Sequence, residues 1–204
     1  MARVREQVSE LCRGWSADKV AEIVSEQLAA TIEPYIYAEA RELLTAHAAA
    51  GHDVIIVSSS GQEMVAPIGA LLGASAIIAT QMEVAAGRYT GVMNFYAYGD
   101  AKADRMRELA AHCNYQLADC FAYSDSVTDI PMLEVVGHPR VVNPDRELRR
   151  AARARGWPVL TFGGRAGQAP RTAGQLARKV PGKGLGQEMN TQLRACDADN
   201  QSRS

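Results

Sequence analysis

The sequence predicts an α/β fold in which helices cover both faces of a parallel sheet. Short apolar runs of strand length alternate with amphipathic segments between Val54 and Phe162. Three helical segments precede the first of these strands. The residues after Phe162 are rich in Gly, Arg and Gln and have no apolar periodicity, which indicates a disordered tail. We therefore expect a helical region at 1–50, an α/β core at 51–162 and a disordered tail at 163–204.

Composition sets the class of protein. The chain has 204 residues, is 47% hydrophobic and carries a net charge of −1, which suits one domain with a small appendage. Such a charge argues against nucleic acid as an obligate partner, and the arginines between Arg140 and Arg155 are interpreted as a solvated helix face. The charged N-terminus and the lack of long apolar runs predict a cytoplasmic protein without a membrane partner. The four cysteines form no zinc or disulfide pattern.

The N-terminal part is predicted to be helical throughout. A first amphipathic stretch ends at Gly14, and a second begins after Ser16 and stops before Pro34. A third spans about Tyr37 to Ala50. His47 lies on this third helix at helical spacing from two leucines, so a partly buried structural role is favoured over a catalytic one.

The first strand carries the first candidate site residues. Val54–Val57 is apolar on both faces, as in an interior strand of a parallel sheet. We expect Ser58–Gly61 to form a turn before a helix that runs from Glu63 to Leu72. Backbone N–H groups and a hydroxyl at a helix N-terminus make an anion site. The alternative is an ordinary loop with a serine N-cap.

A second candidate follows a strand at Ala76–Ile78 and a hairpin around Ala86–Arg88. Lys102 lies in the first turn of the next predicted helix, where its charge opposes the helix dipole. The lysine therefore either points into water, as surface lysines commonly do, or meets an anion.

The third candidate is a pair of carboxylates. Asp125 and Asp129 follow the apolar run Cys120–Tyr123, at the end of a predicted strand. Ligands bind at the carboxyl ends of parallel strands, and oxygen ligands suit Mg²⁺. The alternative is that both aspartates cap the helix around Pro131. A strand, a helix and a final strand complete the core, at Arg140–Val142, Asp145–Arg155 and Pro158–Phe162.

Taken in order, these motifs resemble those of the haloacid dehalogenase (HAD) superfamily, in the subfamily IB branch that contains phosphoserine phosphatase. Ser58 in Val-Ile-Ile-Val-Ser resembles the second family motif, Lys102 the third, and Ser-Asp-Ser-Val-Thr-Asp at 124–129 the fourth. Gly-Arg-Tyr-Thr-Gly at 87–91 and Val-Asn-Pro-Asp at 142–145 also match. The first three helices resemble the rear part of the cap of these enzymes.

The resemblance implies Mg²⁺-dependent hydrolysis of a small phosphorylated metabolite. Asp125 would bind the metal directly, and Asp129 would support the metal or its waters. Ser58, Ser59 and Lys102 would bind the phosphoryl group, and Ser58 and Lys102 would be catalytic. A metal ion, an ammonium and a hydroxyl are what phosphoryl transfer requires for positioning and charge stabilisation.

The nucleophile motif is where the sequence departs from the family. Family members attack phosphorus with the first Asp of Asp-x-Asp-x-Thr, which ends an N-terminal strand. The Asp-x-Asp of this chain, Asp197-Ala198-Asp199, lies in the polar tail and follows no apolar run. We therefore expect an N-terminally truncated, inactive chain. The alternatives are a non-catalytic relative that binds phosphate and metal as a regulatory module, and an unrelated doubly wound domain.

Three further positions differ from phosphoserine phosphatases. Ser124 replaces a Gly, Thr128 replaces a frequent Asn, and Gln7 stands where an Arg would hold the substrate carboxylate. These differences argue against phosphoserine as the substrate. We expect Ser58, Lys102 and Asp125 to converge at the carboxyl edge of one parallel sheet. We also expect this sheet to lack its central strand, so that the strands before Ser58 and Asp125 do not pair.

Overall fold

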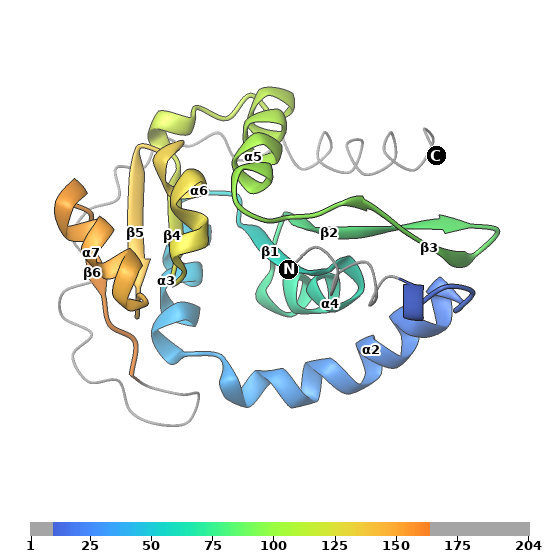
Figure 1. Ribbon diagram of the computed structural model, residues 1–204. Helices are drawn as coiled ribbons and strands as arrows, with labels where there is room; N and C mark the ends of the chain where they lie inside the picture. The colour runs from blue at the N-terminus through green and yellow to red at the C-terminus, as the bar shows by residue number, and fades with distance from the viewer. Residues whose placement is uncertain (1–9, 164–204) are drawn as a thin grey trace.

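The structure is a computed structural model that describes residues 10–163 (Figure 1). The predicted tail, the start of the first helix, Gln7 and Asp197–Asp199 lie outside the described residues. Within them, helices and strands follow the predicted order. The helices are α2 (Ala17–Ile32), α3 (Ala38–Ala49), α4 (Gln62–Leu72), α5 (Asp100–His112), α6 (Ile130–Glu134) and α7 (Arg146–Arg155), with short 3-10 helices η1 (Glu33–Tyr35), η2 (Leu117–Asp119) and η3 (Val127–Asp129).

The described strands form two sheets of three strands each. In the first, β1 (Ile55–Gly61) pairs in parallel with β2 (Ala76–Ala85), which pairs antiparallel with β3 (Arg88–Phe95). In the second, β4 (Phe121–Ser124), β5 (His138–Val142) and β6 (Val159–Leu160) are all parallel. The expected α/β fold with parallel strands is confirmed, and within residues 10–163 the expected sheet is divided into these two parts. The expectation that β1 and β4 are not paired side by side is confirmed.

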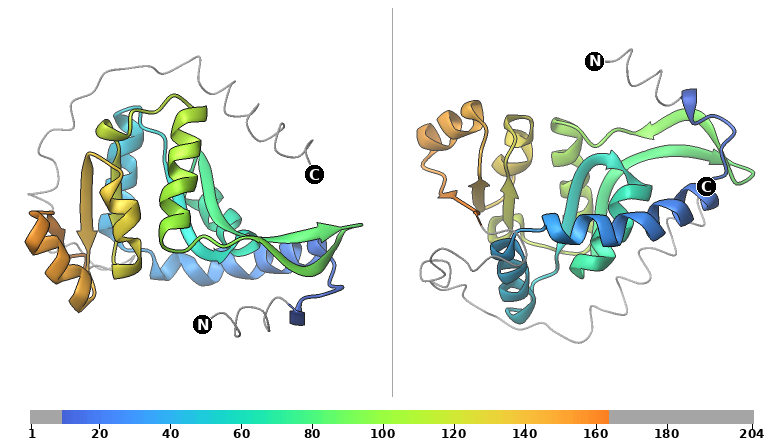
Figure 2. Two further views of the ribbon diagram at one scale, coloured as in Figure 1. Left: turned by 45° about the horizontal axis from the view of Figure 1, so that its top comes forward. Right: turned by 90° about the horizontal axis from the view of Figure 1, so that it is seen from below.

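Helix α5 connects the two halves of the molecule, which are the first sheet with its helices and the second sheet with its helices. It lies between the two sheets in every view and contacts both β2 and α6 (Figures 1 and 2). Helix α2 packs along α4, beside the first sheet, and the β2–β3 hairpin projects away from the body (Figure 2). The second half holds a compact core in which Leu133, Val141 and Leu148 are fully buried.

The serine-rich stretch after the first apolar run is not the expected turn. Val57 pairs with Ile78 and Gly61 pairs with Thr80, so β1 uses four residues where β2 uses two. Ser58–Ser60 therefore form a bulge inside a strand. Helix α4 has Gly61 at its N-cap and no side-chain cap, so the serine N-cap alternative is also wrong.

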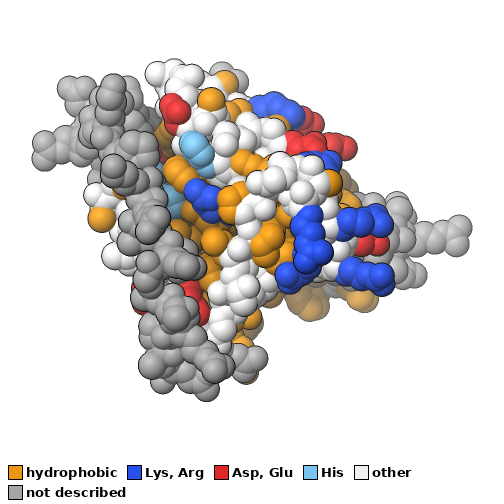
Figure 3. Space-filling model, turned by 90° about the vertical axis from the view of Figure 1, so that its left-hand side faces the viewer, with side chains coloured by type: hydrophobic (Ala, Val, Ile, Leu, Met, Phe, Trp, Pro, Cys, Tyr) orange, Lys and Arg blue, Asp and Glu red, His pale blue; other side chains and the backbone are white. Residues whose placement is uncertain are grey.

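Helix α7 confirms the interpretation of the arginine cluster as a solvated face. Its inner side buries Leu148 and Ala152, and its outer arginines are exposed. Figure 3 shows the molecule from the side on which α7 lies, and Lys and Arg side chains are gathered on one part of this face. No helix between residues 10 and 163 has the length and apolar character needed to cross a membrane.

Candidate active site

Lys102 is the buried charge at the centre of the candidate site. It lies in the first turn of α5, and only 4% of its surface is exposed. Its Nζ lies 2.7 Å from Oδ1 of Asp129. A buried ammonium is stable only with a charged or hydrogen-bonding partner, and Asp129 provides one. The alternative that Lys102 is a surface lysine pointing into water is wrong.

Both carboxylate oxygens of Asp129 accept hydrogen bonds from neighbouring side chains. Oδ1 accepts from Lys102, and Oδ2 accepts from the Ser124 hydroxyl at 2.8 Å. Asp129 occupies the N-cap position of α6, but its side chain makes no capping bond there. The capping interpretation is therefore wrong for Asp129. Sequence reasoning noted Ser124 only as a departure from a family glycine and missed that its hydroxyl holds this carboxylate.

Asp125 lies directly after β4 and is exposed. Its carbonyl accepts the N–H of Asp145 at 2.9 Å, while the Asp145 carboxylate accepts the N–H groups of Val127 and Leu148. These N–H bonds lower the pKa of Asp145. The sequence marked Asp145 only as the start of a helix, although its carboxylate also fixes the loop after β4. The loop is thus held by its backbone, and the Asp125 carboxylate is available to a ligand.

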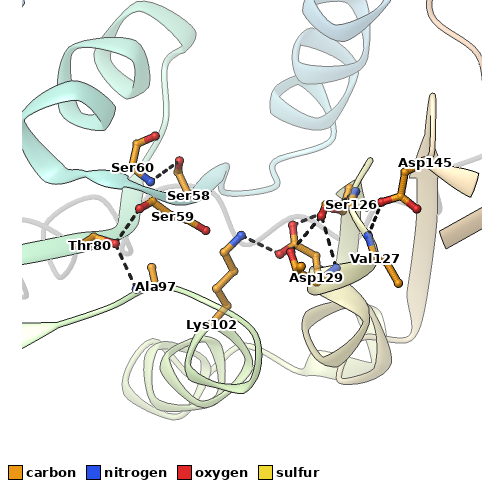
Figure 4. A network of polar contacts seen from close by, with 12 residues as sticks. Ser58, Ser59, Ser60, Thr80, Ala97, Lys102, Ser126, Val127, Asp129 and Asp145 are labelled. Atoms are coloured by element: carbon orange, nitrogen blue, oxygen red, sulfur yellow. Dashed lines mark hydrogen bonds and ion pairs between the residues drawn. The ribbon is translucent and has the colours of Figure 1, made fainter. Parts of the chain in front are cut away.

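The Ser58–Ser60 bulge of the first sheet lies across from the Lys102 side chain (Figure 4). Figure 4 shows the Lys102 ammonium pointing toward the space between this bulge and Asp129. Within the bulge, the Ser58 hydroxyl accepts the Ser60 N–H at 3.2 Å. The end of β1, the first turn of α5 and the segment after β4 thus bring serine hydroxyls, the Lys102 ammonium and the Asp129 carboxylate to one side of the molecule (Figure 4).

The carboxylates near Lys102 supply part of the oxygen donors that Mg²⁺ takes in proteins. Residues 10–163 contain no group of three or more His, Cys, Asp or Glu side chains arranged around a metal position. Mg²⁺ commonly keeps several waters and takes one or two carboxylates together with substrate phosphates. The exposed Asp125 carboxylate suits such a site, whereas both oxygens of Asp129 already have partners in the protein.

The arrangement stabilises negative charge but shows no attacking group. In the described part of the chain, the carboxylate bonded to Lys102 is that of Asp129, which is held on both oxygens. Buried cations and hydroxyls that converge on one space are suited to hold a phosphoryl group.

His47 does not take part in the candidate site. It is buried on α3 and bonded to Tyr123 and His52, as its predicted structural role requires.

Comparisons with known proteins identify the family. The model of the haloacid dehalogenase-like hydrolase family matches residues 1–134. The inhibition of morphological differentiation protein of Streptomyces azureus is 56% identical over 163 residues, which are 79% of this chain and 59% of that protein. A probable phosphatase of Mycobacterium tuberculosis is 52% identical, over 79% of this chain and 56% of that protein. The chain thus spans less than two thirds of the length of these relatives.

Other similarities come from an enzyme and from solved structures. The histidinol-phosphatase of Neisseria meningitidis is 35% identical, over 72% of this chain and 69% of that enzyme. A Bordetella pertussis protein of unknown function aligns with a TM-score of 0.71 and 32% identity, over 78% of this chain and 73% of that one. A phosphoserine phosphatase structure shares the fold, with a TM-score of 0.57 at 21% identity over 79% of this chain and 74% of that chain. The chain belongs to the haloacid dehalogenase-like hydrolase family.

Proposed function

We propose that this chain provides the phosphate-binding and Mg²⁺-binding part of a phosphomonoester hydrolase. The observation that carries the proposal is the buried Lys102 ammonium, held by Asp129 and pointing toward the Ser58–Ser60 bulge. Burying a lysine is costly, and a lysine aimed at a ligand space between two strand ends is placed to neutralise an anion.

Each site residue has a distinct role in this proposal. The hydroxyls of Ser58 and Ser59 hold phosphoryl oxygens, and Lys102 neutralises their charge. Asp125 holds Mg²⁺, which when bound offsets phosphoryl charge as a Lewis acid. Asp129 keeps the Lys102 ammonium in place and could accept hydrogen bonds from metal-bound water as well.

The proposed substrate is a small phosphorylated metabolite. One relative is named histidinol-phosphatase, and another, 38% identical over 60% of this chain, is named phosphoserine phosphatase. Both names refer to monoesters of small amino alcohols or hydroxyamino acids. The shared chemistry is the phosphomonoester group, and the site described above recognises that group and not the remainder of the substrate.

We place the attacking carboxylate outside the described residues. A parallel strand that lay between β1 and β4 would end beside Lys102, where an aspartate could approach phosphorus in line. In its absence the remaining groups position the phosphate without attacking it.

The test is phosphate release from a generic phosphomonoester, measured with and without Mg²⁺. The 204-residue chain is compared with a chain extended upstream to include an apolar strand that ends in Asp-x-Asp, if the reading frame encodes one. We expect no appreciable release by the shorter chain and Mg²⁺-dependent release by the longer one, lost on Asp125→Ala.

Two outcomes would change the proposal. Turnover by the 204-residue chain that Lys102→Ala abolishes would require a nucleophile within it. If no extended chain hydrolyses phosphomonoesters, the enzyme assignment fails and the alternative of a phosphate- and metal-binding regulatory module is favoured.

A further inference from the structure

Thr80 links the two segments that form the candidate phosphate site. It lies on β2, and only 6% of its surface is exposed. Its hydroxyl donates to the carbonyl of Ser59 at 2.8 Å and accepts the N–H of Ala97 at 3.3 Å. One buried side chain is therefore bonded both to the serine bulge of β1 and to the segment that leads into α5 (Figure 4).

The hydrogen bond from the Thr80 hydroxyl to the Ser59 carbonyl replaces a strand-to-strand hydrogen bond that the bulge interrupts. Between Val57 and Gly61, β1 has two more residues than the facing part of β2. A bulge of this kind leaves backbone groups without a ladder partner, and a buried unpaired carbonyl costs free energy. The Thr80 hydroxyl satisfies this carbonyl and fixes the bulge at one position.

The hydrogen bond from the Ala97 N–H to the Thr80 hydroxyl positions the segment between β3 and α5. Ala97 is fully buried and lies between the end of β3 and the start of α5, five residues before Lys102. Its N–H is bonded to the Thr80 hydroxyl and not to a neighbouring strand. The first turn of α5, and with it Lys102, is therefore positioned from the same oxygen atom as the bulge.

We propose that Thr80 is a positioning residue that sets the separation between the Ser58–Ser60 bulge and Lys102, and hence the affinity for a phosphoryl group. Thr80 does not touch the ligand. This inference rests on the proposed function, because it assumes that bulge and lysine bind one phosphate. Small displacements between groups that hold one ligand reduce binding and catalysis strongly.

The test measures binding of inorganic phosphate to the full 204-residue chain by titration calorimetry. Thr80→Val keeps the shape and removes the hydroxyl, whereas Thr80→Ser keeps the hydroxyl. Thr90→Val is a matched control, because the Thr90 hydroxyl also donates to an oxygen, of Glu83, and accepts a backbone N–H, of Val92, in the distant part of the hairpin. Circular dichroism establishes that each variant is folded under the conditions used.

We expect Thr80→Val to weaken phosphate binding by about tenfold or more, which is about 1.4 kcal/mol. Thr80→Ser and Thr90→Val should bind phosphate like the unaltered chain. If Thr80→Val does not fold, Thr80→Cys replaces it, since a thiol is a weaker donor and should give a smaller loss in the same direction. A folded Thr80→Val or Thr80→Cys chain with unchanged affinity overturns the inference. Absence of phosphate binding by the unaltered chain overturns the proposed function itself.

Discussion

At the scale of single residues, the ion pair between Lys102 and Asp129 determines the character of the site. Both side chains are nearly inaccessible to solvent, so neither charge can be left without the other. The sequence indicated both residues but not their contact. They are 27 positions apart, on α5 and η3, and the burial of Lys102 depends on how α5 packs between the two sheets.

Removing one partner of this pair should destabilise the fold. Lys102→Met leaves a buried carboxylate without its cation, and we expect the free energy of unfolding to fall by about 3–5 kcal/mol. Urea unfolding followed by circular dichroism measures this. Arg107→Met is the matched control, because Arg107 forms an exposed pair with Asp104 on the same helix at 2.7 Å. Its effect should stay below about 1 kcal/mol. Equal losses in the two variants would show that the Lys102 pair is not effectively buried.

At the scale of elements, α3 is joined to β4 by a polar contact. His47 Nε2 lies 2.8 Å from the Tyr123 hydroxyl, and His47 Nδ1 lies 2.9 Å from His52 Nδ1. Burial, then the nearby His52 and Arg140, lower the pKa of His47 from its ordinary value of 6.5. The folded chain therefore keeps this ring neutral at a pH where the unfolded chain takes up a proton.

This shift makes stability dependent on pH. Below about pH 6.5 the unfolded state binds a proton that the folded state does not, so the free energy of unfolding should fall as the pH decreases from 7.5 to 5.5. His47→Gln should reduce this slope, whereas His112→Gln, at the exposed end of α5, should not. Urea unfolding at several pH values measures the slopes. A slope that His47→Gln leaves unchanged would contradict the role of His47.

Strand β1 shows where sequence reasoning reached its limit at this scale. Val54–Val57 correctly indicated a strand, and the helices on either side were predicted within a few residues. The serines after Val57 indicated a turn because Ser and Gly are typical of turns. They instead continue the strand as a bulge, since their conformation depends on pairing with β2 and on Thr80. Thr80 itself gave no signal, because threonine is common in strands.

At the scale of the whole molecule, the two sheets have edges that do not pair with each other. Side chains of β1 such as Ile55 and Ile56 are only half-buried, although their apolar pattern is that of an interior strand, whereas Val141 in the middle of the second sheet is fully buried. Sequence reasoning predicted that β1 and β4 do not pair. It could not predict that the halves would be held together by α5 and the Lys102–Asp129 pair.

Such edges should affect solution behaviour. Unpaired strand edges with apolar side chains promote association with other chains. We expect the purified 204-residue chain to stay folded when dilute but to self-associate as its concentration rises. Sedimentation velocity at several concentrations measures this. A chain that stays monomeric at all of these concentrations would instead indicate a self-sufficient module.

We propose that the ends of β1 and β4 form one phosphate and Mg²⁺ site. Asp125 is the residue to alter, because its carboxylate is exposed and available to a ligand. The measurement is the affinity for inorganic phosphate with and without Mg²⁺, in Asp125→Asn and in Asp119→Asn, which alters an exposed aspartate at the opposite end of β4. We predict that Mg²⁺ tightens phosphate binding in the unaltered chain and in Asp119→Asn but not in Asp125→Asn. The same Mg²⁺ effect in both variants, or no phosphate binding at all, would contradict a shared phosphate and Mg²⁺ site.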